Sequence, residues 1–285
     1  MKLNLPSLTL VCVDGRHPEL ALYALQRCMN QIDFGAVVLF SKSGTACPLG
    51  VELVSIDGDI HSSADYSEFM INRLPDHIRT DFVLVVQWDG FILDASLWRD
   101  EFLDSDYIGP VWQHLPVEVG NGGFSLRSRR LLLAAQAMNM APTHPEDYVL
   151  CCTHRVALEA AGLVFATPEL ANQFAFESDN RGAATFGFHS FNNFHRAMDD
   201  QQLADYLARC PRDILLSDVC RGLIKNALKA GRVKAAMEVA RRRFKLGGLR
   251  TRLDLLNLVS RTPFYWLRYR ANRRAAPFTP MASQS

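Results

Sequence analysis

The chain has 285 residues, of which 48% are hydrophobic, and its formal net charge is +1. This size suits one large or two modest domains with a substantial core. No run of about 18 apolar residues is present, which argues against a membrane-spanning helix, and the short apolar stretch that ends at Asp14 does not resemble a secretory signal. The seven cysteines contain no CxxC pair, so we expect reduced thiols in a cytoplasmic protein.

Charge is distributed unevenly along the chain. Residues 221–274 hold 16 Lys and Arg residues but only two acids, Glu238 and Asp254, which gives this segment a net charge of +14. The remainder holds 15 basic and 28 acidic residues and carries −13. Such a division indicates two parts with different partners.

Apolar runs and turn residues alternate through the first 90 residues. Pro18 at the start of an apolar periodic segment is typical of a first helical turn. Short β-branched runs closed by turn residues indicate strands. Strands are expected at residues 7–13, 36–40, 51–56 and 82–87, and helices at 18–29 and 66–74. This alternation predicts a layered α/β fold with a mainly parallel sheet.

The next hundred residues continue the pattern less regularly. We expect a helix and then a short strand within 94–112, a strand at 123–126, helices at 128–138 and 146–161, and a strand at 163–166. Residues 172–193 are rich in Phe, Gly and Asn, which favours a loop over a site. Beyond residue 203 the pattern is helical.

Three short segments between residues 82 and 147 carry the chemistry. The run 82–87 ends in Trp88, Asp89 and Gly90, so a buried strand would deliver a carboxylate to the carboxyl edge of the sheet, where open α/β folds bind ligands. A glycine-rich turn, residues 119–123, opens into another strand. Two adjacent acids, residues 146 and 147, begin a helix.

Four segments, 85–92, 107–112, 120–128 and 186–189, together resemble the donor and acceptor sites of GT-A glycosyltransferases, in particular an uncharacterised bacterial family of GT-A-like domains. The resemblance covers about residues 7–195. It implies a GT-A-like fold, which is a Rossmann-like mixed, mainly parallel sheet with a C-terminal helical region. It also implies a glycosyltransferase domain over residues 1–200 and a basic helical region over 201–285. The implied activity is transfer of a sugar from a nucleotide-sugar donor to a saccharide or lipid-linked acceptor.

The resemblance also implies a divalent metal, Mn or Mg. Asp89 occupies the position that closes the Asp-x-Asp motif of that superfamily, but the first acid is replaced by Gln87. His189 would be the second protein ligand, with His195 as the alternative, and a neutral imidazole suits manganese better than calcium. The structural alternatives are a turn aspartate that caps a strand end and a packed or surface histidine.

The order of a Gly-Gly strand, a helix and then two acids is similar to that of beta-1,4-galactosyltransferases. This similarity implies that Asp147 is the catalytic base of an inverting displacement and that Glu146 binds substrate hydroxyls. The alternative is that both acids only favour the dipole of a first helical turn. The residues expected to bind substrate are Asp14, Arg16, Gln87, Trp88, Trp112, Asn121, Gly122, Gly123 and Glu146.

Two other functions stay open. Loss of an acid at Gln87 is compatible with a non-catalytic nucleotide-sugar or glycan-binding module. A nucleotidyltransferase would use a similar sheet, but it normally carries a glycine-rich, basic loop after the first strand, and residues 14–18 are not such a loop.

The basic C-terminal region suits an anionic membrane surface. Its leucines recur near helical spacing, and aromatic residues mixed with arginines follow Pro263, a combination typical of the lipid headgroup boundary. The protein would then be peripheral on the inner face of the membrane. The alternatives are packing against the acidic remainder of the chain and, less favoured for lack of a motif, nucleic acid.

Overall fold

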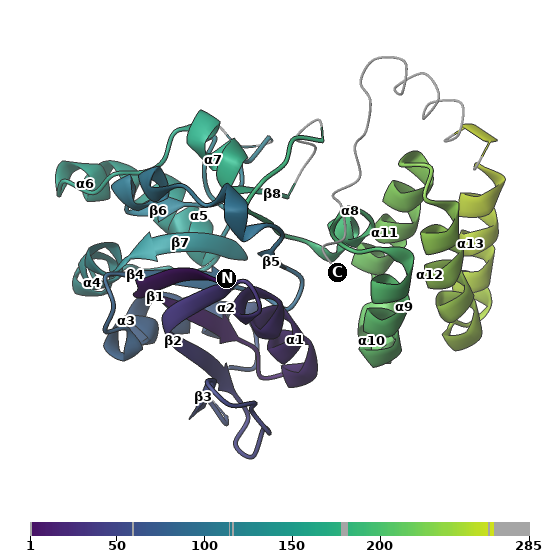
Figure 1. The fold of residues 1–285 in the computed structure, drawn as a ribbon, viewed down its shortest axis with the longest axis horizontal. Coiled ribbons are helices and arrows are strands. Elements are labelled where there is room, and N and C mark those ends of the chain that lie inside the picture. The colour runs from purple at the N-terminus through teal and green to yellow at the C-terminus, as the bar shows by residue number, and fades with distance from the viewer. Residues whose placement is uncertain are drawn as a thin grey trace. The chain divides into compact units, whose positions relative to one another are not determined.

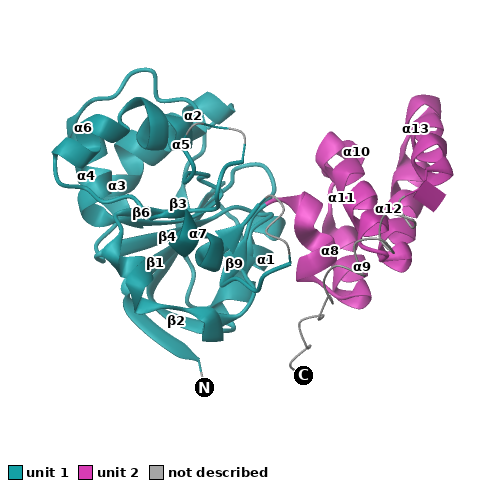
Figure 2. Ribbon diagram, turned by 90° about the horizontal axis from the view of Figure 1, so that it is seen from above, with its two compact units in different colours: residues 1–189 teal, residues 190–285 magenta. Residues whose placement is uncertain are grey.

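In the computed structural model, the residues described are 2–58, 60–113, 115, 117–177, 182–261 and 263–264. The chain divides into two compact units, residues 1–189 and residues 190–285 (Figure 2). The first unit is built on a sheet with helices, and the second is helical (Figure 1). The fold class expected from the sequence, a mixed α/β domain followed by a helical region, is confirmed.

The central sheet has six strands in the order β3-β2-β1-β4-β7-β6. Strands β3, β2, β1 and β4 pair in parallel, whereas β7 is antiparallel to both β4 and β6. The strands of the sheet are β1 (Leu3–Val13), β2 (Ile32–Ser41), β3 (Glu52–Ser55), β4 (Phe82–Val86), β6 (Tyr107–Ile108) and β7 (Phe124–Ser128). The runs at the centre are apolar on both faces because the sheet is covered on both.

Register brings the first candidate residues to one edge. Cys12 of β1 pairs with Val86 of β4, so the chain leaves the sheet at Asp14 and at Gln87 side by side. A smaller sheet then extends this edge. It consists of β5 (Phe91–Ile92), β9 (Gly187–Phe188) and β8 (Ala175–Phe176), in the order β5-β9-β8.

Helices of the first unit pack on this framework. Helix α1 lies against β2 and β5. A cluster of buried apolar side chains joins Val11, Phe40 and Val85 of the sheet to Phe69 and Leu74. Ser62 caps α2 in a capping box, and Ser128 caps α4. The helical segments are α1 (Pro18–Met29), α2 (Ser63–Glu68), η1 (Phe69–Arg73), α3 (Leu74–His77), α4 (Arg129–Ala137), α5 (Glu146–Tyr148), η4 (Val149–Thr153), α6 (Arg155–Ala160) and α7 (Pro168–Phe174).

Several expected elements are wrong in detail. The single helix 146–161 is three pieces, because the carbonyl of Val149 accepts from His154 N–H five residues on and interrupts the regular ladder. The helix expected within 94–112 is two 3-10 turns, η2 (Ala95–Leu97) and η3 (Asp100–Asp104). In place of the expected strand 163–166 there is one isolated bridge, between Tyr107 and Phe165. Its partner strand, β6, has only two residues.

The described residues of the segment 172–193, which are 172–177 and 182–193, include regular elements that the sequence did not predict. It contains the end of α7 and the strands β8 and β9, and aromatic packing explains this. The ring centroids of Phe174 and Phe186 lie 5.8 Å apart, and Phe124 lies 5.2 Å from Phe174 and 6.1 Å from Phe186. These contacts hold the two strands against β7.

The second unit is a set of short and medium helices, and α12 is at its centre, in contact with α9, α10, α11 and α13. Its segments are η5 (Phe191–Asn193), α8 (Phe194–Ala197), α9 (Asp200–Arg209), α10 (Arg212–Leu216), α11 (Asp218–Lys229), α12 (Val233–Leu246) and α13 (Leu249–Ser260). Arg243 is buried and donates to the carbonyls of Leu215 and Ser217 at 2.6 and 2.7 Å. Within the described ranges, no helix combines the length and apolarity needed to cross a membrane.

Candidate functional site

The site begins where β4 ends. Gly90 N–H donates to the Gln87 carbonyl, which closes a turn with Asp89 at its corner. Asp89 is 8% exposed, and Gln87 and Trp88 are half-buried. A Cβ at Gly90 would lie 2.8 Å from the carbonyl oxygen of Phe188, so glycine permits this close approach of the β5 and β9 ends.

His189 lies beside Asp89 because of strand pairing. Phe91 of β5 pairs with Phe188 of β9, so the residue after β9 faces the turn before β5. His189 Nε2 is 3.3 Å from Asp89 Oδ1 and 3.2 Å from Gln87 Oε1, and its Nδ1 is 3.0 Å from Glu177 Oε1. Burial lowers the pKa of His189, but the carboxylates of Asp89 and Glu177 outweigh it and raise the pKa to about 10.

The contacts of His189 Nε2 are those of an ion pair and a hydrogen bond, and their spacing is also compatible with ligands of a divalent metal. Two ligands of one octahedral ion lie about 3 Å apart when each bond is about 2.1 Å, and the separations of Asp89 Oδ1 and Gln87 Oε1 from His189 Nε2 are similar. Across the described part of the chain, no group of three or more His, Cys, Asp or Glu side chains converges as a metal site. Asp89, His189 and the amide oxygen of Gln87 would therefore provide three protein ligands at most. A bound ion would need phosphate or water oxygens as well.

The glycine-rich turn contacts both sides of the site. Asn121 adopts a φ of +64°, its Nδ2 donates to Glu177 Oε2 at 2.5 Å, and its Oδ1 accepts from Gly123 N–H at 3.2 Å. A Cβ at Gly123 would lie 2.1 Å from His189 Nε2, and one at Gly122 would lie 2.2 Å from Glu146 Oε1. The side chains of His189 and Glu146 thus occupy the space next to Gly123 and Gly122, two glycines that the sequence analysis expected to bind substrate.

The two adjacent acids have different surroundings. Asp147 is half-buried; its Oδ2 accepts from Gly122 N–H at 3.0 Å and its Oδ1 from Tyr148 N–H at 2.8 Å. Glu146 is buried and forms an ion pair of 2.9 Å with Arg127, which is itself fully buried. Burial raises the pKa of Glu146, and the Arg127 guanidinium opposes that rise. Asp147 is the more accessible carboxylate, whereas the carboxylate of Glu146 is paired with the guanidinium of Arg127.

The remaining expected residues divide into two groups. Asp14 lies at the shared strand edge, where its Oδ1 accepts from the backbone N–H groups of Arg16 and His17 at 2.7 and 2.8 Å. Arg16 is exposed at the same turn. Trp112 packs in the core, 7% exposed, in a cluster with Tyr107. Asp14 and Arg16 therefore lie together at the strand edge, whereas Trp112 lies among buried side chains.

Sequence reasoning missed three residues that hold this site. Glu177 joins His189 to Asn121, Arg127 neutralises Glu146, and the Tyr66 hydroxyl accepts from Gln87 Nε2 at 3.2 Å. A signal for Glu177 was present, because it follows a short apolar strand directly. For Arg127 and Tyr66, the sequence gives no local sign of their long-range partners.

If His189 holds a Mn²⁺ ion, Glu177→Gln is expected to weaken Mn²⁺ binding by about 10- to 100-fold, the usual effect of removing the outer carboxylate of a metal-bound histidine. A glutamine keeps an oxygen for His189 Nδ1–H but loses the negative charge and the acceptor for Asn121. The measurement is a Mn²⁺ titration of the full chain by electron paramagnetic resonance. Glu169→Gln, an exposed acid on neighbouring α7, is the control. Equal affinity of Glu177→Gln and wild type would remove this role.

His195, the alternative ligand, belongs to the second unit. It is 6% exposed, its Nδ1 lies 2.9 Å from the Asn192 carbonyl, and burial lowers its pKa to about 4. Its surroundings are those of a packed, neutral histidine, which is the structural alternative that the sequence left open for a histidine in this region.

The depressed pKa of His195 predicts acid sensitivity. Between pH 6.5 and about 4, the unfolded chain binds a proton that the folded chain does not, so the free energy of unfolding falls as pH falls, by up to about 1.4 kcal/mol per pH unit. Above pH 6.5 the effect is absent. His195→Asn keeps a donor for Asn192 but cannot titrate. Urea unfolding at pH 7.5 and pH 5 should show a smaller loss in the variant; parallel losses would contradict the assignment.

Comparisons with known proteins extend these observations. Residues 50–189 match the sequence profile of a family described as a protein of unknown function, DUF5672. No curated protein matches the chain. Several solved structures are similar to it at low identity.

Three of these structures are described as a synthase, a glycosyltransferase and a mannosyltransferase. Glucosyl-3-phosphoglycerate synthase from Mycobacterium tuberculosis, with Mn²⁺, UDP and glucosyl-3-phosphoglycerate, is 10% identical, with a TM-score of 0.32 over 44% of this chain and 57% of that one. Glycosyltransferase GlyE from Streptococcus pneumoniae is 13% identical, with a TM-score of 0.41 over 66% and 54%. A mannosyltransferase from Pyrobaculum calidifontis, with GDP-Man and Mn²⁺, is 12% identical, with a TM-score of 0.38 over 96% and 89%.

The chain thus spans little more than half the length of the first two structures, 57% and 54%.

Proposed function

We propose that residues 1–200 form a glycosyltransferase domain that moves a sugar from a nucleotide-sugar donor to a saccharide or lipid-linked acceptor. One observation carries the proposal: the glycine-rich turn contacts His189 through Gly123 and Asp147 through Gly122. A pair of metal-ligand type, His189 with Asp89, and an accessible carboxylate therefore lie on either side of one turn at the carboxyl edge of the sheet. Transfer from a nucleotide sugar needs both groups close together.

The roles follow from the two needs of the reaction. A divalent ion, when bound, would offset the negative charge that develops on the leaving diphosphate. Asp89 and His189 would hold that ion, with Gln87 beside them. Asp147 would accept the proton of the acceptor hydroxyl as that hydroxyl attacks the anomeric carbon. A single attack of this kind inverts the configuration at that carbon. Arg16 and Asp14, at the neighbouring strand end, would contact the nucleotide.

A non-catalytic binding module is the second candidate, and Gln87 favours it. An amide at this position leaves Asp89 as the one carboxylate at the metal-ligand position, where the resembled enzymes commonly have two acids. A module of this kind would bind nucleotide sugar without turning it over. Hydrolysis of nucleotide sugar by the full chain in Mn²⁺, measured as release of nucleoside diphosphate, separates the two functions.

A thermal-shift panel tests the proposal. The full chain is heated with nucleotide sugars of several bases, including UDP- and GDP-sugars, with Mn²⁺ or with a chelator. A ligand that binds the folded state raises the melting temperature in proportion to the logarithm of its concentration over Kd. We expect one base class to stabilise the protein and Mn²⁺ to increase the shift. No stabilisation by any member of the panel would contradict the proposal.

We also propose that the basic C-terminal region binds an anionic membrane surface. Leu249, Leu253 and Leu256 are 74%, 56% and 62% exposed on α13, and each basic residue near such a surface adds about 1 kcal/mol. Residues 265–274, which the sequence analysis included in this region, lie outside the described residues. Flotation with anionic liposomes should recover the full chain but not a chain that ends at Gly248. Equal recovery of both, or no recovery of the full chain, would remove this proposal.

A further inference from the structure

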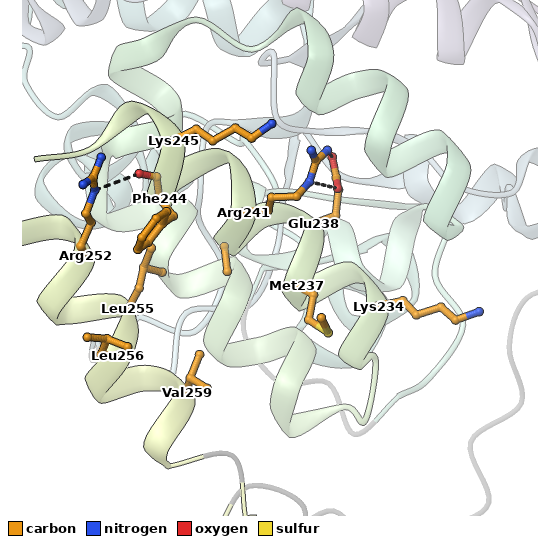
Figure 3. A pocket seen from close by; sticks show the side chains of 11 residues that line it. Lys234, Met237, Glu238, Arg241, Phe244, Lys245, Arg252, Leu255, Leu256 and Val259 are labelled. Carbon is orange, nitrogen blue, oxygen red and sulfur yellow. Dashed lines mark hydrogen bonds and ion pairs between the residues drawn. The ribbon is translucent and has the colours of Figure 1, made fainter.

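A groove of about 660 Å³ lies between α12 and α13, and apolar side chains of both helices line it (Figure 3). Single small ligands occupy sites of about 300–1,000 Å³. Met237 and Phe244 of α12 are 65% and 48% exposed, and Leu256 and Val259 of α13 are 62% and 54% exposed. Apolar surface of this kind, with a polar rim, marks interaction sites on folded proteins.

The groove is lined mainly by side chains that the unit leaves exposed, together with the buried Leu255 of α13. The buried residues of α12 are Ala235, Ala236, Val239 and Arg243. Met237 and Phe244 are seven residues apart, which places them on one face of the helix. On α13, Leu255 and Leu258 are buried, whereas Leu256 and Val259, three residues apart, stay exposed. The exposed apolar side chains therefore form a stripe along each helix, and these two stripes line the groove.

The rim of the groove is basic. Its charged lining residues are Lys234, Glu238, Arg241, Lys245 and Arg252, a net charge of +3. Glu238 is already neutralised, because its carboxylate accepts from Arg241 and Arg242 at 3.0 and 2.7 Å. The Arg252 guanidinium lies 4.8 Å from the Phe244 ring centroid, which keeps its charge over the apolar floor.

We propose that this groove binds one anionic phospholipid molecule, with an acyl chain along the apolar floor and the phosphate at the end of the groove that carries Lys245 and Arg252. Charge selects this occupant over two alternatives, the rest of the chain after residue 264 and a second copy of this protein. The rest of the chain after residue 264 carries four arginines and no acid, and a second copy of the same surface is equally basic, so both would be repelled. The proposal specifies a site within the membrane association proposed above and does not depend on transferase activity.

The test uses two single-chain lipids of equal chain length below their micelle concentrations. Lysophosphatidylglycerol is anionic and lysophosphatidylcholine is zwitterionic. The full chain should bind lysophosphatidylglycerol with 1:1 stoichiometry in native mass spectrometry. Calorimetry should give an affinity about tenfold or more above that for lysophosphatidylcholine, because basic side chains favour the anionic headgroup. Equal affinities, or no 1:1 complex, would overturn the proposal.

Two variants on α13 locate the site. Leu256→Asp places a carboxylate in the groove and should weaken binding of lysophosphatidylglycerol about tenfold or more. Asn257→Asp is the matched control, since it adds the same charge to α13 at an exposed position that does not line the groove. Equal losses in both variants would show binding to the outer surface of α13 and overturn the groove. Liposome flotation of the wild type is read separately, so failure of the membrane proposal is distinguishable.

Discussion

Asp147→Asn is expected to lower the rate of sugar transfer by about 100-fold or more and to leave donor binding unchanged. An asparagine keeps an oxygen for Gly122 N–H, which Asp147 Oδ2 accepts at 3.0 Å, so the turn keeps its shape. The amide cannot accept a proton from an acceptor hydroxyl. The rate is measured as single-turnover release of nucleoside diphosphate from the nucleotide sugar that the thermal-shift panel selects, and donor affinity from the shift itself.

A matched variant separates this role from a helix-dipole effect. Glu169 is also an acid in the first turn of a short helix, α7, so Glu169→Gln should reduce dipole stabilisation to a similar extent. We expect that variant to keep the wild-type rate. If Asp147→Asn retained full activity, Asp147 would not be the base, and the acid would serve only the helix.

Asp89→Ala is expected to abolish the part of donor binding that depends on Mn²⁺. Removal of an outer-shell partner alone costs about 10- to 100-fold in metal affinity, and Asp89 is proposed to contact the ion directly. The variant should therefore show the same thermal shift with donor in Mn²⁺ and in chelator, whereas wild type should show a larger shift in Mn²⁺.

Asp81→Ala provides the control for this variant. Asp81 is an exposed acid immediately before β4, and Asp89 follows the other end of the same strand. The control should keep the wild-type response to Mn²⁺. Equal donor binding by wild type in Mn²⁺ and in chelator would rule out the metal role for both Asp89 and His189.

The fold was predictable because its signals are local. The apolar run that became β4 ends at a polar turn, and pairing with β1 then places Asp89 at the carboxyl edge. The start of α1 at Pro18 follows from the same kind of local pattern. Boundaries failed where a local signal was overridden, as at Val149, where a five-residue turn breaks an otherwise good helical pattern.

The site was less predictable, because its geometry depends on partners far apart in the sequence. Proximity of Asp89 and His189 comes from the pairing of two-residue strands, β5 and β9, too short for a pattern to reveal. Burial of Glu146 against Arg127 is equally invisible in the sequence, where Glu146 and Asp147 look alike. In the C-terminal region, the spacing of the leucines predicted helices. The groove could not be predicted from that spacing, because it forms where α12 packs on α13.

The ion pair of Arg127 with Glu146 has a consequence for how this sequence can change over evolution. Both side chains are buried, and a Cβ at Gly122 would lie 2.2 Å from Glu146 Oε1 and 2.8 Å from Arg127 Nη2. Loss of either charge alone would leave the other buried without compensation. These three positions should therefore covary among homologous sequences, with glycine retained wherever the arginine and glutamate are both present. Neighbouring Asp147 lies outside this ion pair, so the charge of Arg127 does not constrain it in the same way.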